Sequence, residues 1–151
     1  MISATTIKTP KGYARISAST EKIVSIEFCD APEKSGPANA LLDNCAKELT
    51  QFFAGETRTF SSPLHDRGSV FQKAVWKALL KVPYGEVVTY GELALMAGYP
   101  KAARAVGSAC KKNPFPFIVP CHRVLPSDKS LGGYAGGAEM KQWLLDSEKQ
   151  S

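Results

Sequence analysis

The feature that most constrains the fold is a change in hydrophobic pattern across residues 60–69. Before this segment, residues 22–28 (KIVSIEF) alternate apolar and polar side chains, as a half-buried strand does. After it, apolar residues recur at helical spacing from Val70 onwards. The segment itself, FSSPLHDRGS, is polar and rich in turn-forming residues. We therefore interpret it as a linker, which divides the chain of 151 residues into domains of residues 1–66 and 67–151.

The first domain is predicted to be a small α+β unit. Stretches with strand propensity flank a turn at residues 10–12 (PKG), and the strand over 22–28 follows. Residues 32–37 are predicted to form a loop. A helix is expected over residues 41–53, because apolar residues recur there at helical spacing: Leu41, Leu42, Cys45, Leu49, Phe52 and Phe53.

The second domain is predicted to be mostly helical. A helix that starts at Val70 is expected to end at residues 83–85 (PYG). A glycine-rich loop covers residues 132–137, and a final helix is expected over residues 138–148.

The middle of this domain has the pattern of a helix-turn-helix. Thr89 and Glu92 have the spacing of a capping box, which predicts a helix over residues 90–96. After a turn that contains Gly98, a second helix is expected over residues 101–112. A short helix, a tight turn and a second helix in this order are typical of a DNA-binding helix-turn-helix.

Charge and side-chain size favour DNA as the partner of the second helix. The formal net charge is +5, and residues 101–123 contain five Lys or Arg residues and no Asp or Glu. The helix begins with small residues, which allow close approach of whatever lies opposite, and Arg104 projects from among alanines. Two alternatives remain open: a solvated basic face, and tight packing against another helix.

The cysteines and the terminus indicate where such a chain works. Four cysteines form no CxxC pair, and with two histidines a four-ligand zinc site is not expected. No secretory leader and no membrane-spanning stretch are recognisable. We therefore expect free thiols in a reducing, cytoplasmic compartment and no membrane association.

Cys121 is the candidate nucleophile. It follows an apolar run, residues 115–119 (FPFIV), and Pro120, so it lies where a buried segment meets a polar turn. We expect His122 and Arg123 to lower the pKa of its thiol, because the thiolate is the reactive species. The alternative is a buried cysteine that acts as a small hydrophobic residue.

His122 needs an acceptor that orients its ring if it is to assist Cys121. The final helix offers Glu148, which we prefer, and also Glu139 and Asp146; spacing alone does not choose among them.

Several segments together resemble the O6-alkylguanine-DNA alkyltransferases. The resemblance is strong over residues 68–148, where the Pro-Cys-His-Arg-Val motif is highly specific, and over 1–67 only the layout of strands and helix matches. The matching segments are Phe71-Gln72 to Trp76, residues 85–90 (GEVVTY), 100–107 (PKAARAVG), 113–124 (NPFPFIVPCHRV), 132–134 (GGY) and 141–145 (KQWLL). The resemblance implies a ribonuclease-H-like α+β N-terminal domain and a winged-helix-like C-terminal domain with the helix-turn-helix.

The resemblance also implies the reaction and its catalytic residues. Cys121 would take the alkyl group from O6 of guanine, and from O4 of alkylated thymine, irreversibly and once per protein molecule, without a cofactor or a catalytic metal. His122, held by Glu148, would act through water as the base for Cys121. Tyr90 would donate to N3 of the departing guanine, and Asn113 would brace the turn before the active-site loop.

For DNA, the resemblance implies binding by a monomer in the minor groove with the damaged base flipped out. Arg104 would fill the space that the base leaves, and the small residues would let the helix lie close to the DNA. The DNA-binding residues would be Thr89, Tyr90, Ala102, Ala103, Arg104 and Gly107.

The substrate pocket would combine a lid with the active-site loop. Ala135 would donate its N–H to O6, the carbonyls of Cys121 and Val124 would accept from the guanine amino group, and Pro116 and Gly136 would border the alkyl group. The pocket residues would be Cys110, Pro116, Val124, Tyr134, Ala135 and Gly136.

Three departures from the family pattern concern the pocket and metal binding. Ala135 stands where members often have serine, and Cys110 stands where they often have a larger apolar residue such as methionine. Some members bind zinc near the N-terminus, but Cys29 and His65 alone cannot form that site, so no metal is expected.

Two other functional classes remain as alternatives. The first is a helix-turn-helix regulator in which Cys121 is structural or senses alkylation. The second is a cysteine hydrolase, which nothing in the sequence supports beyond the glycines that could form an oxyanion hole. Alkyltransferase-like proteins that only bind the lesion lack the acceptor cysteine, and Cys121 argues against that class.

Overall fold

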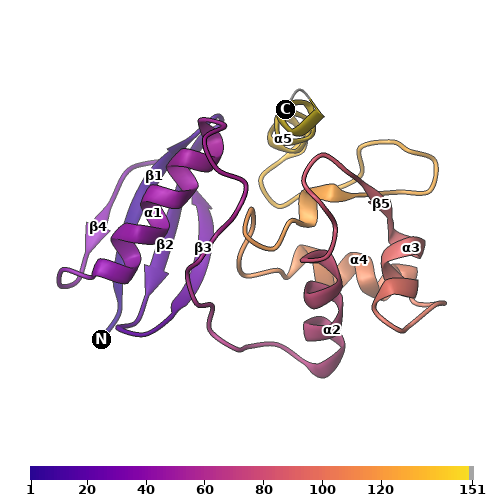
Figure 1. Ribbon diagram of the computed structural model, residues 1–151, viewed down its shortest axis with the longest axis horizontal. Helices are drawn as coiled ribbons and strands as arrows, with labels where there is room; N and C mark the ends of the chain where they lie inside the picture. The colour runs from indigo at the N-terminus through magenta and orange to yellow at the C-terminus, as the bar shows by residue number, and fades with distance from the viewer. Residues whose placement is uncertain (150–151) are drawn as a thin grey trace. The chain divides into compact units, whose positions relative to one another are not determined.

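In the computed structural model, which describes residues 1–149, the chain divides into two compact units. The first unit is Met1–Asp66 and the second begins at Arg67 (Figure 1). None of the helices among the described residues is long and apolar enough to span a membrane.

The first unit contains an antiparallel sheet of four strands in the order β3-β2-β1-β4. Its strands are β1 (Ser3–Thr9), β2 (Gly12–Ala18), β3 (Ile23–Cys29) and β4 (Lys34–Ser35). Burial alternates along β2, where Ala14, Ile16 and Ala18 are fully buried and the residues between them are half-buried. This period of two gives the sheet one buried face.

Helix α1 (Ala40–Phe53) covers that face (Figure 1). Asn39 caps it by accepting a hydrogen bond from the backbone N–H of Leu42. The buried stripe of α1 repeats at helical spacing, and burial of a leucine side chain such as Leu49 stabilises the fold by about 2 kcal/mol. Its members are Leu42, Cys45, Leu49 and Phe52.

The second unit is built around three helices that pack on one another: α2 (Val70–Leu79), α3 (Tyr90–Met96) and α4 (Ala103–Lys111). Capping boxes open α2 at Ser69 and α3 at Thr89. The indole N–H of Trp76 donates to the carbonyl of Ala109 over 2.9 Å, which ties α2 to α4 in the interior.

A two-stranded parallel sheet connects the start of α3 to the segment that follows Cys121. Strand β5 (Val88–Thr89) pairs with β6 (Val124–Leu125). The short 3₁₀ helix η1 (Cys121–Arg123) immediately precedes β6, and α5 (Ala138–Lys149) closes the unit. The ladder therefore brings Tyr90, the first residue of α3, to the neighbourhood of the Cys121 turn.

The predicted fold class is confirmed: a sheet-and-helix unit precedes a mostly helical unit. Three boundaries were wrong. Residues 32–37 contain β4 rather than only a loop, because Lys34 and Ser35 pair with β1. The helix expected over 101–112 begins at Ala103, because Ala102 has the non-helical angles φ −105° and ψ 33° and its N–H donates to the carbonyl of Tyr99 in a turn.

The third correction concerns the predicted linker, since most of residues 60–69 belongs to one unit or the other. The backbone N–H of Ile23 donates to the carbonyl of Pro63, and the N–H of His65 donates to the carbonyl of Ile23. Ser61 bonds the carboxylate of Glu48, and Ser69 already caps α2. Polar composition predicted a linker here, but these polar groups have specific hydrogen-bond partners.

Candidate functional site

A tight turn presents Cys121 at the start of η1. Pro120 has φ −81° and ψ 66°, and the N–H of Cys121 donates to the carbonyl of Val119 over 2.8 Å. These are the features of an inverse γ-turn, and the proline ring already restricts φ close to the required value. The apolar run before Pro120 is buried, so the thiol is held in the interior with 8% of the residue exposed.

Asn113 braces the loop that leads to this turn. Its side-chain amide donates to the carbonyl of Val119 over 2.8 Å, and its side-chain oxygen accepts from the N–H of Phe115 over 2.9 Å. One side chain thereby closes both ends of the buried loop. The predicted bracing position of Asn113 agrees with this geometry.

Within the same loop, Phe117 has φ 75°, in the left-handed region that side chains other than glycine rarely adopt. Its side chain is 1% exposed, so burial holds the residue in this conformation. Such strain costs about 1–3 kcal/mol and persists where the surroundings over-determine the backbone. The loop that carries Cys121 is therefore a rigid element.

Glu148 on α5 is the acceptor for His122. Its Oε2 lies 2.6 Å from Nε2 of His122, and its Oε1 accepts from Nε of Arg123 over 2.8 Å. The N–H of Gly85 also donates to this carboxylate, and Arg123 donates further to the carbonyl of Val82. Glu148 is thus the one of the three acidic candidates that bonds the ring.

The pKa values of this buried group indicate an ionised carboxylate beside a neutral imidazole. Burial alone raises the pKa of Glu148, but hydrogen bonds from His122 and Arg123 outweigh it and bring the pKa to about 2. Burial lowers the pKa of His122 against the opposing effect of Glu148. Neutral His122 then donates from Nε2 to Glu148.

The other ring nitrogen of His122, Nδ1, is buried and has no hydrogen-bond partner among the described residues. In the neutral tautomer just described, Nδ1 carries a lone pair. A buried acceptor without a partner is costly and points to a ligand or a water. Nδ1 is therefore available to take a proton.

The thiol of Cys121 is tuned by residues other than those expected. Burial raises its pKa, and the side chain of Asn113 and the positive charge of Lys141 oppose that rise. The prediction that His122 and Arg123 lower this pKa was wrong, because His122 is neutral and the charge of Arg123 is paired with the Glu148 carboxylate.

Lys141 is a further residue of the site, and its role was not predicted from the sequence. It is fully buried in α5, and its Nζ donates to the carbonyls of Val124 and Gly133. Burial lowers its pKa, and negative charge on Cys121 or Cys110 raises it again. Its position in the sequence could have revealed it, since residues 140, 141, 144, 145 and 148 form one buried stripe of α5.

Tyr90 faces this centre from the start of α3. The nearest ring atom lies 3.8 Å from where a β-carbon on Gly107 would be, so the absence of a side chain there lets the ring lie against α4. Burial raises the pKa of Tyr90, and negative charge on Cys110 and Cys121 raises it further. Tyr90 therefore stays protonated and can donate a hydrogen bond.

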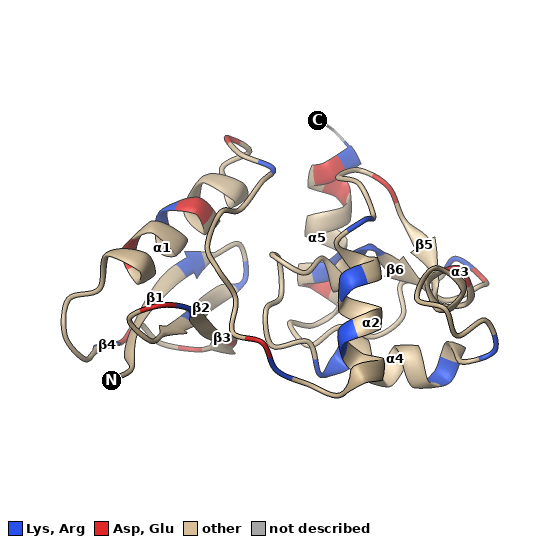
Figure 2. Cartoon of the chain, turned by 60° about the horizontal axis from the view of Figure 1, so that its bottom comes forward, with Lys and Arg blue, Asp and Glu red and all other residues tan. Residues whose placement is uncertain are grey.

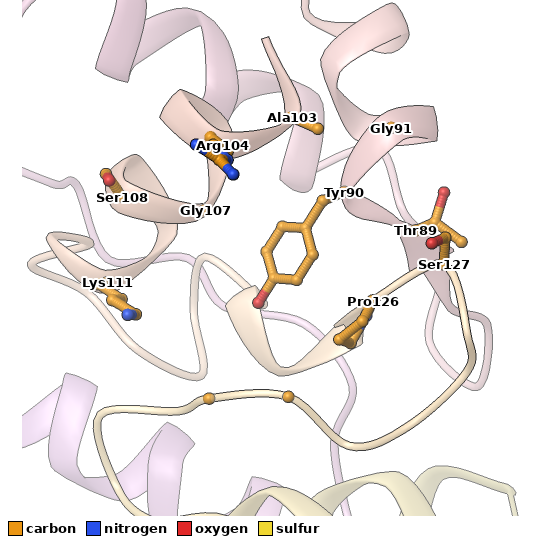
Figure 3. Close-up of a pocket in the computed structure, with 12 residues that line it drawn as sticks. Thr89, Tyr90, Gly91, Ala103, Arg104, Gly107, Ser108, Lys111, Pro126 and Ser127 are labelled. Atoms are coloured by element: carbon orange, nitrogen blue, oxygen red, sulfur yellow. The ribbon is translucent and has the colours of Figure 1, made fainter.

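A cavity of about 710 Å³ opens between α3, α4 and the loop after β6. Figure 3 shows the Tyr90 side chain extending into it, with Arg104, Ser108 and Lys111 along α4 and Pro126 across from them. The remaining lining residues are Thr89, Gly91, Ala103, Gly107, Ser127, Gly132 and Gly133.

A second, much smaller cavity contains the thiol. Its volume is about 10 Å³, and three of its lining residues, Tyr90, Lys111 and Gly133, also line the large cavity. The large cavity therefore leads to the thiol. The small cavity is lined by Tyr90, Cys110, Lys111, Cys121, Gly133, Tyr134 and Ala135.

The structure does not bring every predicted residue to these cavities. Pro116, Val124 and Gly136 line neither, and the carbonyl of Val124 accepts from Lys141. Ala102 precedes α4 and also lies outside the lining, whereas Ala103, Arg104 and Gly107 are part of it. Ser108, Lys111 and Pro126 line the large cavity and were not predicted.

Charge is unevenly distributed around the large cavity. Figure 2 shows Lys and Arg positions on α2 and α4, and neither of these two helices contains Asp or Glu. Arg104 and Lys111 line the cavity, and none of its lining residues within the described part of the chain is Asp or Glu. Within residues 1–149, no cluster of three or more His, Cys, Asp or Glu side chains is placed to hold a metal ion.

These features define a class: a protein of two units whose helical unit holds a buried thiol in a small cavity that adjoins a larger, basic one. Comparison with known families gives the same division. The 6-O-methylguanine DNA methyltransferase ribonuclease-like domain matches residues 2–65, and the DNA binding domain of the same family matches residues 70–150. The chain belongs to the 6-O-methylguanine DNA methyltransferase family, which is the O6-alkylguanine-DNA alkyltransferase family.

Individual relatives agree over nearly the whole chain. The methylated-DNA–protein-cysteine methyltransferase of Methanosarcina acetivorans is 39% identical over 147 residues, 93% of this chain and 94% of the relative. That of Mycobacterium leprae is 39% identical over 99% of this chain and 93% of the relative. The crystal structure of Mycobacterium tuberculosis O6-methylguanine methyltransferase superposes with a TM-score of 0.89 at 38% identity, covering 99% of this chain and 94% of that one.

Proposed function

We propose that this protein repairs DNA by moving an alkyl group from O6 of guanine, and from O4 of alkylated thymine, to Sγ of Cys121. Transfer is irreversible, so each molecule acts once. The observation that carries the proposal is the buried thiol in the small cavity beside the large one. It is next in sequence to His122, whose Nδ1 has no hydrogen-bond partner among residues 1–149. The relatives' names support it, because they are methylated-DNA–protein-cysteine methyltransferases.

The reaction begins with loss of the Cys121 proton. Burial keeps the thiol protonated at rest, which protects it from other reagents. A water molecule between Sγ and Nδ1 of His122 relays the proton to the neutral ring. Glu148 stays ionised, because its pKa is about 2, and stabilises the imidazolium that forms.

The thiolate then attacks the alkyl carbon. A C–S bond forms as the C–O6 bond breaks, and the electron pair leaves with guanine. Tyr90 donates a hydrogen bond to N3 of the departing base, which lowers the charge on the leaving group. Lys141 opposes the cost of negative charge on the buried sulfur.

DNA contacts the large cavity through the minor groove. Ala103 and Gly107 let α4 lie close to the backbone, and the N-terminus of α3 at Thr89 and Tyr90 faces a phosphate. Arg104 enters the duplex in place of the flipped base, because the alkyl carbon is inaccessible inside a stacked helix. The solved DNA complex of the Mycobacterium tuberculosis protein, similar with a TM-score of 0.87 at 39% identity, supports DNA as the partner.

The substrate pocket lies at the small cavity. Tyr134 and Ala135 line it and form the lid, and the N–H of Ala135 donates to O6. The two predicted borders of the alkyl group, Pro116 and Gly136, lie outside the lining of both cavities, so their role stays a prediction. The protein acts as a monomer and without a cofactor. It works in the compartment that holds the chromosome, which in a cell without a nucleus is the cytoplasmic nucleoid.

Mass spectrometry of the intact protein tests the proposal. After incubation with duplex DNA that contains one O6-methylguanine, the protein gains one methyl group, and peptide mapping locates it on Cys121. Cys121→Ser gains none. An unmodified wild-type protein that still binds the DNA would contradict the proposal and favour a binding module or a regulator.

A further inference from the structure

A second thiol lies in the pocket of the acceptor. Cys110 is in the last turn of α4, 8% exposed, and lines the same small cavity as Cys121. The volume of that cavity is about 10 Å³, which is roughly enough for a single water molecule. A group attached to either sulfur therefore occupies the space in front of the other.

The electrostatics of the neighbours agree with this geometry. Negative charge on Cys121 raises the pKa of Cys110, which burial already brings to about 12. The pKa of Tyr90 responds to both thiols, and so does that of Lys141. Two sulfurs that act on the same tyrosine and the same lysine share one local environment.

Methyl transfer does not involve the second thiol, since the product, S-methylcysteine at Cys121, carries no further electrophilic carbon. A 2-haloethyl group is different. After its transfer to Cys121, the sulfur carries a chain of two carbons with a halide at its end. Such β-halo thioethers are strong alkylating agents and would otherwise react with water or with the bound DNA.

We propose that Cys110 is a second nucleophile that captures this product in a thioether bridge, so that the protein disarms 2-haloethyl lesions as well as removing them. The inference rests on the proposed function, because Cys121 must first accept the group. The ligand class is a guanine that carries a 2-haloethyl group on O6.

The chemistry balances without an oxidant or a cofactor. The sulfur of Cys110 attacks the carbon that bears the halogen, directly or after the Cys121 sulfur has closed a three-membered episulfonium ring. A new C–S bond forms, the carbon–halogen bond breaks, and halide leaves with the electron pair. The Cys110 proton is released to water. The product is Cys121–S–CH2–CH2–S–Cys110, and both thiols are consumed.

Proximity favours the bridge over competing reactions. Two groups held together react as if at a very high effective concentration. Hydrolysis needs water, and the small cavity has space for about one molecule. Because burial raises the pKa of Cys110, the bridging step accelerates as the pH rises from neutral to mildly alkaline.

The test uses the full-length protein and an oligonucleotide with freshly prepared O6-(2-chloroethyl)guanine, in oxygen-free buffer. The expected main product has gained C2H4 and lost two hydrogens, contains no chlorine, and yields one cross-linked peptide pair that joins Cys110 to Cys121. Hydroxyethyl or chloroethyl on Cys121 with Cys110 unmodified would overturn the inference. So would a cross-link from Cys121 to DNA or to Lys111, the amine that lines the same cavity.

Matched variants and substrates separate this inference from the proposed function. The measured quantity is the bridged fraction of all protein alkylated on Cys121. Cys110→Ala reduces this fraction to zero, whereas the control Cys29→Ala, whose cysteine lies in β3 of the first unit, keeps the wild-type fraction. O6-ethylguanine DNA gives a simple ethyl adduct in every variant that retains Cys121. If O6-methylguanine leaves Cys121 unmodified, the proposed function fails; if it methylates Cys121 and the chloroethyl substrate gives no bridge, this inference alone fails.

Discussion

Cys45 in the first unit and Cys121 in the second are both buried thiols, yet their surroundings differ. Cys45 lies on the buried stripe of α1, fully buried, and burial raises its pKa to about 11. A hydrogen bond with Ser62 lowers that pKa, and the negative charge of Glu48 raises it. Burial also raises the pKa of Cys121, but there the nearby charge is the positive one of Lys141.

The difference extends to access and to proton transfer. Cys121 lines a small cavity that shares residues with a larger, basic one. Nδ1 of its neighbour His122 has no hydrogen-bond partner in the part of the chain that the structure describes. Among the described residues, no other histidine side chain is buried. Burial alone therefore makes a thiol inert, whereas a nearby positive charge, a base and access from a cavity make it an alkyl acceptor.

The largest effect is expected from substituting Glu148, which bonds the histidine next to Cys121, compared with Glu48, whose charge acts on Cys45. Glu148→Gln leaves the buried Arg123 without its counter-charge, so we expect the free energy of unfolding to fall by about 3–5 kcal/mol and methyl transfer to be lost with it. The control is Glu48→Gln, whose amide oxygen can still accept from Ser61 and Ser62; a loss of about 1 kcal/mol is expected there. Chemical denaturation measures both, and equal losses would contradict the comparison.

The same pair gives a pH signature. The pKa of Glu148 is about 2 in the folded protein and near 4.5 when unperturbed, so its stabilisation is complete above pH 4.5 and is lost as the pH falls towards 2. We expect the wild type to lose stability across this window and Glu148→Gln to lose less. Acid titration at fixed denaturant measures the slope, and identical slopes would show that Glu148 is not the titrating group.

Access from DNA is expected to depend on Arg104. Arg104→Ala should slow repair of duplex DNA by about tenfold or more, corresponding to about 1.4 kcal/mol, and should leave reaction with free O6-benzylguanine little changed. Lys112→Ala, at the end of α4 but outside the cavity lining, is the matched control. Single-turnover rates on both substrates measure the effect. Equal losses on duplex and free base would refute the role of Arg104.

A smaller, pH-dependent effect is expected from Lys141. Removing its charge in Lys141→Met lets the pKa of Cys121 rise further, so transfer should slow severalfold at neutral pH and recover as the pH increases. Lys141→Arg retains the charge and should keep a profile closer to that of the wild type. The measurement is the alkylation rate against pH. A loss that does not depend on pH would indicate that Lys141 only supports the loop through Val124 and Gly133.

The smallest effect is expected at Gly107. A β-carbon there would lie at ordinary contact distance, 3.8 Å, from the Tyr90 ring, so Gly107→Ala should stabilise α4 by up to about 1 kcal/mol. Close approach of DNA should make the same variant slower on duplex DNA. Thermal unfolding and duplex repair rates measure the two effects, and an unchanged duplex rate would argue against close approach of α4.

Local signals in the sequence predicted much of the fold. The alternation over residues 22–28, the apolar spacing in α1 and the capping box at Thr89 each depend on neighbouring residues, and each element formed close to its predicted bounds. The helix-turn-helix pattern corresponds to α3 and α4. Long-range pairing was not predictable in this way, because nothing local reveals that Val88 pairs with Val124.

The site was predictable in identity but not in electrostatics. Cys121 and His122 were found through their motif, and Glu148 was chosen over Glu139 and Asp146 only by resemblance. Lys141 escaped notice because lysine is almost always exposed, although its place on the buried stripe of α5 marks it as unusual. The shift in the pKa of Cys121 depends on residues that are close in space, such as Asn113 and Lys141. Adjacency in sequence to Arg123 therefore gave a wrong prediction of what lowers that pKa.

Peptide-resolved alkylation under excess substrate measures whether Cys121 alone accepts the methyl group, and how often. The four cysteines are followed over time while the protein is exposed to a large molar excess of O6-methylguanine DNA. We expect methylation to stop at one group per molecule, entirely on Cys121, with Cys29, Cys45 and Cys110 unmodified. Continued turnover, or methyl groups on Cys45 at a comparable rate, would contradict it.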